Sequence, residues 1–199
     1  LPQIFDNFLP ADSSVTLELT ECDNDQAQDG LLNGTFDVIL FVAEGVRPTV
    51  DFKILITAPP YCLLPAAHSL TQQSSVSMEQ IALEPLIVLN RPVAAAYYEG
   101  LFQPGARQAP VAAYANSTEM VRSIVASGRG CAILNMRPLT TESYTGAKVV
   151  ALPISDDLPP LTLAIGYDKS RPRRSVKDFV KSCETYFANA GSSLCIVER

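Results

Sequence analysis

The segment from Ser117 to Asn135, STEMVRSIVASGRGCAILN, constrains the fold most, because it predicts a helix, a tight turn and a buried strand in immediate succession. Asn116 or Ser117 can cap the helix, and Glu119 in the first turn complements the helix dipole. The run CAIL (131–134) is as continuously apolar as a strand that is covered on both faces. A unit of this kind belongs to an open α/β sheet.

The alternation of helix and strand recurs along the chain. The hydrophobic periodicity predicts helices at 26–33, 77–83, 93–102 and from Ser175 to near Gly191, and strands at 36–42, 53–57, 61–64, 86–89, 110–115, 149–154 and 161–167. An opening helix is predicted from the helical spacing of Ile4, Phe5, Phe8 and Leu9. The alternating segment VTLELT (15–20) then predicts a half-buried strand. Ser175 is the expected N-cap of the last helix.

Size and charge exclude several classes of protein. A chain of 199 residues, 47% of them hydrophobic, can bury one sizeable core or two small ones. Its apolar runs are strand-sized, well short of the roughly 20 residues that a membrane-spanning helix needs, so no membrane segment is expected. The net charge of -6 opposes nonspecific binding to phosphate backbones or anionic lipid. This segment alone is therefore not expected to hold DNA.

A basic run and five cysteines invite other interpretations. The basic residues are Lys169, Arg171, Arg173, Arg174 and Lys177. No aromatic residues interleave with them to stack bases, so we interpret the run as a solvated loop before a helix. The cysteines are Cys22, Cys62, Cys131, Cys183 and Cys195. Their odd number and wide spacing argue against a disulfide framework, a zinc site or a sensing pair, and favour small core residues.

The sequence offers little for catalysis. It contains no G-x-S-x-G, H-E-x-x-H or Walker motif, and its single histidine, His68, is interpreted as structural. The GRG segment at 128–130 precedes a strand rather than opening a helix, so it is no dinucleotide fingerprint. We therefore predict no enzyme, no catalytic residue, no metal site and no cofactor.

Four segments together resemble a known family. They are LLNGTFDVIL (31–40), CLLPAAHSL (62–70), EPLIVLNRP (84–92) and VRSIVASGRGCAIL (121–134). Their order and spacing resemble the effector-binding domain of LysR-type transcriptional regulators, over nearly the whole chain from LPQIF to SVKDFVKSCETYF. The resemblance implies an α/β fold of two Rossmann-like subdomains, joined by a hinge of crossing strands and similar to type 2 periplasmic binding proteins.

The resemblance also implies parts that this chain does not include. These are an N-terminal winged helix-turn-helix domain with a linker helix, and a strand and polar loop before the first helix that contribute to the effector site. Residues 1–87 plus 166–199 are expected to form subdomain I, and residues 88–165 subdomain II.

Ligands of open α/β sheets bind beyond the carboxyl ends of the strands, so we expect a ligand in a cleft between the subdomains. The segments placed to line it contain Asp23, Asn24, Arg91, Asn116, Ser117, Thr118 and Asn135. Each has a structural alternative. Serine and threonine cap helices, asparagines stabilise turns, and Arg91 can pair with an acidic neighbour as readily as with a carboxylate ligand. Asp23 would repel an acidic ligand.

The function that the resemblance implies is ligand sensing. A small-molecule effector, with a carboxylate as the natural partner of Arg91, would change the geometry of a DNA-bound homodimer or homotetramer in the cytoplasm. DNA would be bound only through the missing N-terminal domain. The alternative is an extracytoplasmic solute-binding protein of a transporter, which uses the same kind of cleft. Free cysteines fit a reducing compartment and disfavour that alternative.

Overall fold

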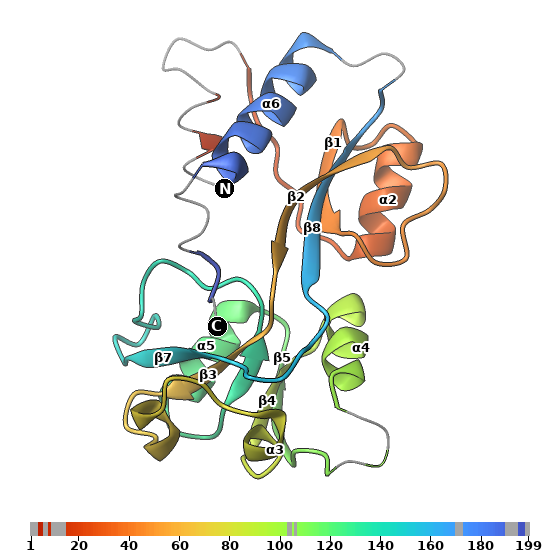
Figure 1. The fold of residues 1–199 in the computed structure, drawn as a ribbon. Coiled ribbons are helices and arrows are strands. Elements are labelled where there is room, and N and C mark those ends of the chain that lie inside the picture. The colour runs from red at the N-terminus through yellow and green to blue at the C-terminus, as the bar shows by residue number, and fades with distance from the viewer. Residues whose placement is uncertain are drawn as a thin grey trace. The chain divides into compact units, whose positions relative to one another are not determined.

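The chain folds into alternating helices and strands from residue 24 onward, as the sequence predicts (Figure 1). The computed structural model describes residues 4, 5, 8, 15–102, 105, 107–169, 173–189 and 195–197. The helices are α2 (Asn24–Leu32), η1 (Ser69–Gln72), α3 (Met78–Ile81), α4 (Pro92–Gly100), α5 (Thr118–Ala126) and α6 (Arg174–Ala188). The strands are β1 (Val38–Val42), β2 (Phe52–Ala58), β3 (Tyr61–Pro65), β4 (Leu86–Leu89), β5 (Val111–Ala115), β6 (Ala132–Leu134), β7 (Val149–Pro153) and β8 (Leu161–Tyr167).

The chain divides into two compact units. Unit 1 comprises residues 1–57 and 162–193, and unit 2 comprises residues 58–161 and 194–199. The sequence analysis placed the first boundary between the subdomains at 87/88, whereas residues 58–87 pack in unit 2. The reason is that β3 is the central strand of a sheet with the order β6-β3-β7, so its partners lie in that unit. The second boundary falls at 161/162, near the expected 165/166.

Unit 1 is a three-stranded sheet with the order β1-β8-β2, covered on two faces. Successive residues of β1 contact opposite helices, as strand geometry requires. Ile39 and Phe41 belong to a core that includes Ala27 and Leu31 of α2. Val38 and Leu40 pack with the buried face of α6, which contains Val176, Val180 and Cys183. The hydrophobic periodicity that predicted this last helix therefore corresponds to its buried face.

Unit 2 combines a parallel pair of strands with an antiparallel sheet. β4 pairs with β5 in parallel, and β3 pairs antiparallel with both β6 and β7. A parallel bridge between Leu86 and Cys131 joins the two, since the N–H of Ile87 donates to the carbonyl of Cys131 at 2.8 Å and the N–H of Cys131 donates to that of Pro85 at 2.9 Å. A hydrophobic core, built on β3, whose first four residues are buried, extends through the unit.

Two predictions of local structure were wrong. Residues 15–20 form no strand, and Leu19 is 66% exposed, because alternation produces a strand only where a neighbour supplies hydrogen bonds and a core covers one face. Ser175 does not cap the last helix. Arg173 occupies the N-cap without a side-chain bond, so Ser175 lies in the first turn. Ile4, Phe5 and Phe8 are helical as expected, whereas Leu9 and Gly191 lie outside the described residues.

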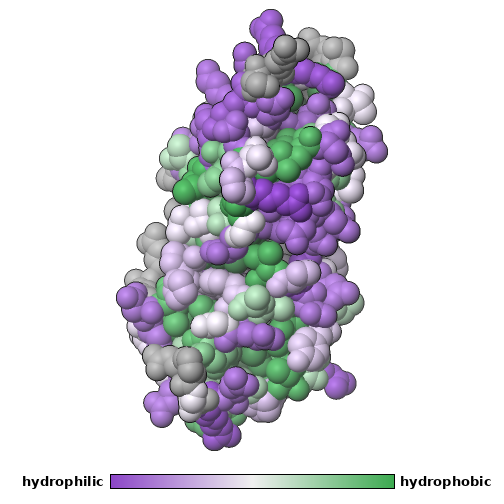
Figure 2. All heavy atoms as spheres, turned by 90° about the vertical axis from the view of Figure 1, so that its right-hand side faces the viewer, coloured by the Kyte–Doolittle hydropathy of each residue, from purple (hydrophilic) through white to green (hydrophobic). Residues whose placement is uncertain are grey.

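On the face drawn in Figure 2, hydrophobic residues lie in groups between hydrophilic ones. Among the described residues, no helix has both the length and the apolar character needed to cross a bilayer.

Gly130 is required where the two sheets of unit 2 meet. It has a φ of 150°, and a Cβ at this position would overlap the carbonyl oxygen of Pro85. We expect Gly130→Ala to lower the free energy of unfolding by about 2–4 kcal/mol, measured by urea denaturation. Gly128→Ala is the matched control. Its φ is also positive, at 80°, but its Cβ would meet open space, so a loss of about 1 kcal/mol is expected. Equal losses in the two variants would contradict this explanation.

Candidate functional site

Five of the seven predicted ligand residues lie along one edge of unit 2. The parallel register pairs Leu89 with Ala115, and the N–H of Asn90 donates to the carbonyl of Ala115 at 2.8 Å. The parallel bridge at Cys131 aligns β6 with β4. The residues that follow the carboxyl ends of β4, β5 and β6 therefore share this edge, which we call the carboxyl edge. They are Arg91, Asn116, Ser117, Thr118 and Asn135.

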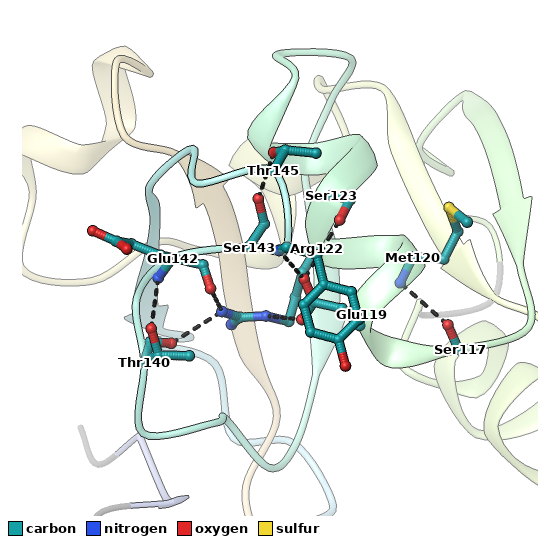
Figure 3. Close-up of polar contacts among 10 residues, drawn as sticks. Ser117, Glu119, Met120, Arg122, Ser123, Thr140, Glu142, Ser143 and Thr145 are labelled. Atoms are coloured by element: carbon teal, nitrogen blue, oxygen red, sulfur yellow. Dashed lines mark hydrogen bonds and ion pairs between the residues drawn. The ribbon is translucent and has the colours of Figure 1, made fainter.

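The N-terminus of α5 forms one part of the carboxyl edge. Ser117 is the N-cap, and its hydroxyl accepts a hydrogen bond from the N–H of Met120 at 3.2 Å (Figure 3). Its capping role is therefore confirmed. In the described part of the chain, the side chains of the exposed Asn116 and the half-buried Thr118 make no hydrogen bond. The edge thus keeps two short polar side chains beside the positive end of a helix dipole.

Arg91 lies at the start of the neighbouring helix. It is the N-cap of α4, with Pro92 at the first helical position and no side-chain capping bond. A half-buried arginine here places a permanent positive charge beside a helix N-terminus, where free N–H groups also favour anions. This part of the edge is suited to a planar, negatively charged group.

Asn135 is buried and fully hydrogen-bonded within the protein. Its side-chain N–H groups donate to the carbonyl of Ala58 and to the hydroxyl of Tyr97, each at 3.0 Å. Its side-chain oxygen accepts from the hydroxyl of Tyr98, also at 3.0 Å. The hydroxyl of Tyr97 donates to the carbonyl of Pro159 at 2.6 Å. These contacts give Asn135 a structural role, but they join distant segments rather than stabilise a local turn, and nothing in the sequence pointed to the two tyrosines as its partners.

Tyr61 lies at the start of β3 in the same core. Its side chain is fully buried, and its hydroxyl has no hydrogen-bond partner among the described residues. Burial raises the pKa of this phenol well above its usual range, although Arg122 and Arg137 oppose the shift. Burial likewise raises the pKa of Tyr98. Both phenols therefore stay protonated at neutral pH, and Tyr98 donates its proton to Asn135.

Arg122 fastens α5 to the segment that follows β6 (Figure 3). Its guanidinium is buried, donates to the carboxylate of Glu119 at 2.9 Å, and donates to the carbonyls of Thr140 and Glu142 at 3.0 and 2.8 Å. The second carboxylate oxygen of Glu119 accepts from the N–H of Tyr144 at 2.7 Å. Sequence reasoning missed this clamp. The available signal was a charged residue on the helix face that carries Val121 and Val125.

Asp23 and Asn24 lie in unit 1, where local contacts occupy them. Asp23 is the N-cap of α2 and forms a reciprocal capping box with Gln26. The side chain of Asn24 donates to the carbonyl of Val42 at 2.8 Å and accepts from its N–H at 3.0 Å. These contacts fix the start of α2 to the end of β1.

Unit 2 also contains a hollow of about 700 Å³ between α3, the end of α4 and the β7–β8 loop. Apolar side chains and four charged ones line it. They include Met78, Leu101, Leu158, Glu79, Asp156 and Arg107. None of the seven predicted ligand residues is among the described residues that line this hollow.

The basic run near α6 is partly neutralised by aspartates. Lys169 pairs with Asp51 at 3.2 Å, and Arg173 pairs with Asp37 at 3.2 Å. Arg171 lies outside the described residues. These pairs support the interpretation of the run as ordinary surface.

Substitution of Arg122 tests the clamp. We expect Arg122→Met to lower the free energy of unfolding by about 3–5 kcal/mol, because it leaves a carboxylate and two carbonyls without their buried donor. The control is Arg129→Met, an exposed position just beyond α5, with an expected change within about 0.5 kcal/mol. Similar denaturation midpoints for the two variants would refute the clamp.

The cysteines predict a simple labelling pattern. All five are free thiols, of which Cys22 and Cys195 are half-buried and the other three are buried. Burial raises the pKa of Cys183 to about 11. A thiol hydrogen bond with Cys131, together with burial, raises the pKa of Cys62. Because thiolates are the reactive form, a thiol reagent at pH 8 should label Cys22 and Cys195 in the native protein and all five after denaturation. Native labelling of Cys62 or Cys183 would be inconsistent with this core.

Comparisons with known families and with solved structures indicate one family. HinK, a LysR family transcriptional regulator from Pseudomonas aeruginosa, has a TM-score of 0.85 and 27% identity, and the match covers 94% of this chain but only 66% of HinK. The BenM effector-binding domain with benzoate has a TM-score of 0.81 at 15% identity, covering 96% of this chain and 87% of that domain. The effector-binding domain of QuiR with shikimate has a TM-score of 0.74 at 16% identity, covering 94% and 90%.

These matches confirm the α/β, periplasmic-binding-protein-like fold and do not favour the transporter alternative. The matched relatives are transcriptional regulators rather than enzymes. No curated protein sequence matches the chain. The family model for the LysR substrate binding domain matches residues 1–188, and the chain therefore belongs to that family.

Proposed function

We propose that this domain senses a small-molecule effector at the carboxyl edge of unit 2. The observation that carries the proposal is the convergence of Arg91, Asn116 and Thr118 at the carboxyl ends of β4 and β5. Two of these side chains have unused hydrogen-bonding capacity, and the third is a permanent cation. Such an edge of an α/β sheet is where ligands of this class of fold bind.

A carboxylate is the ligand class that the edge fits best. Arg91 can donate hydrogen bonds to both oxygens of a carboxylate, while the N-terminus of α5 adds a favourable dipole and the hydroxyl of Thr118. The named ligands of BenM and QuiR, benzoate and shikimate, both carry one carboxylate. Ser117 and Asn135 would position this edge, since their side chains are engaged within the protein. Asp23 and Asn24 would hold the start of α2 in the same supporting way.

The rest of the regulator is also part of the proposal. The chain spans 66% of HinK, which leaves room in such a protein for a DNA-binding domain. DNA would be bound by an N-terminal winged helix-turn-helix outside this segment, in a homodimer or homotetramer located in the cytoplasm. The effector would bias one oligomer geometry through its differential affinity for two conformations. No catalytic step is proposed.

A thermal-shift screen of small carboxylates, beginning with benzoate and shikimate, tests the site. At a ligand concentration of about 100 times Kd, the midpoint of unfolding should rise by roughly 5–10 °C. Arg91→Ala and Thr118→Ala should each remove most of this rise, because each deletes a direct contact with the carboxylate.

Arg129→Ala serves as the charge-matched control, since Arg129 is exposed and lies away from the carboxyl edge. Its shift should equal that of the unmodified protein. If Arg91→Ala and Thr118→Ala respond like this control, the ligand binds elsewhere and the proposed site is wrong.

A further inference from the structure

The two segments through which unit 2 continues into unit 1 have the same chemical character. The unit boundaries fall at 57/58 and 161/162, and the adjoining residues are Ala58-Pro59-Pro60 and Leu158-Pro159-Pro160. We call these the crossing segments. Proline has no N–H and a fixed φ, so each segment is stiff and offers mainly carbonyl oxygens to the rest of the protein.

One carbonyl from each crossing segment is bound by the same pair of side chains. Asn135 donates to the carbonyl of Ala58, and Tyr97 donates to the carbonyl of Pro159, while Asn135 also donates to the hydroxyl of Tyr97. Carbonyls only accept, so these bonds fix the orientation of the whole network. The amide of Asn135 must present its N–H groups to Ala58 and Tyr97, and its oxygen is left for the hydroxyl of Tyr98.

The network begins on α4, whose N-terminus carries part of the proposed site, and on the end of β6 at the same edge. Tyr97 and Tyr98 lie on α4, whose N-cap is Arg91, and Asn135 follows β6 at the carboxyl edge. Asn135 is 4% exposed and Tyr98 is 6% exposed, and the two tyrosine rings pack edge to face with their centroids 5.1 Å apart. A displacement of α4 therefore moves Tyr97, which holds Pro159, and acts on Asn135, which holds Ala58, through the hydrogen bonds of the two tyrosine hydroxyls.

We infer that Tyr97 and Asn135 are positioning residues that transmit the state of the carboxyl edge to both crossing segments. A ligand bound at Arg91 fixes α4, α4 fixes the hydroxyl of Tyr97, and this hydroxyl, together with Asn135, fixes the carbonyls of Pro159 and Ala58. The inference rests on the proposed function for the source of the signal. The restraint on the crossing segments is independent of any ligand.

Tyr97→Phe tests the restraint in the ligand-free chain. The variant keeps the ring on α4 but releases the carbonyl of Pro159 and deprives Asn135 of one acceptor. Fluorophores are attached through unnatural amino acids at Asp25 and Arg129, which are exposed residues of unit 1 and unit 2. Single-molecule energy transfer then reports the distribution of distances between the two fluorophores. We expect Tyr97→Phe to broaden this distribution, while the melting temperature falls by only about 2–4 °C.

Tyr98→Phe is the matched control. It removes the same hydroxyl from the next residue of the same helix and breaks a bond to the same asparagine, but Tyr98 donates to neither crossing segment. It should cost a similar fall in melting temperature and leave the distance distribution unchanged. The inference is overturned if Tyr97→Phe leaves the distribution unchanged, or if Tyr98→Phe broadens it equally.

A second measurement separates this inference from the proposed function. A carboxylate identified in the thermal-shift screen should narrow the distance distribution of the unmodified chain and have a smaller effect in Tyr97→Phe, although both proteins still bind it. If no carboxylate binds, the proposed site fails and the ligand-free comparison still decides the restraint. If a carboxylate binds and narrows the distance distributions of both proteins equally, the transmission through Tyr97 is refuted.

Discussion

The architecture of unit 2 depends on two backbone hydrogen bonds around Cys131. They join the parallel pair β4-β5 to the antiparallel sheet β6-β3-β7, and they form only because Gly130 lets the chain approach Pro85 closely. This junction aligns the end of β6 with the ends of β4 and β5, and so brings Asn135 to the carboxyl edge. Main-chain contacts thus determine where the side chains of the proposed site can meet.

Periodicity predicted most elements because burial on one face or two leaves a regular pattern in the sequence. β4 and β5 were located closely, and the helix at 118–126 followed from its cap and apolar face. The segment 15–20 shows the limit of this reasoning, because alternation records how a strand could be buried but cannot supply the neighbour that pairs with it. The boundary expected at 87/88 lies at 57/58 for a similar reason, because the strands that pair with β3 follow it far along the chain.

The positions of residues in the candidate site could be predicted where they follow from local strand and helix geometry. Contacts between distant segments of the chain could not be predicted. The carboxyl ends of successive parallel strands converge by geometry, so Arg91 and Thr118 could be placed near each other from the sequence. The partners of Asn135 come from three other segments of the chain, and the roles of Tyr97 and Tyr98 could not be deduced from helical spacing. Arg122 was missed because a charged residue within an apolar stripe is ambiguous until its acceptors are known.

The crossing segments are held by their carbonyl oxygens. The residues that supply these acceptors are therefore less constrained in identity than the residues that supply the donors. A main-chain acceptor is present whatever side chain stands at Ala58 or Pro159, so those positions can change in related proteins without loss of the contact. The donors have no such freedom, because only an amide at Asn135 and a hydroxyl at Tyr97 complete the pattern. Covariation between relatives should therefore join Asn135 to Tyr97, and the residues that they bind should drift independently.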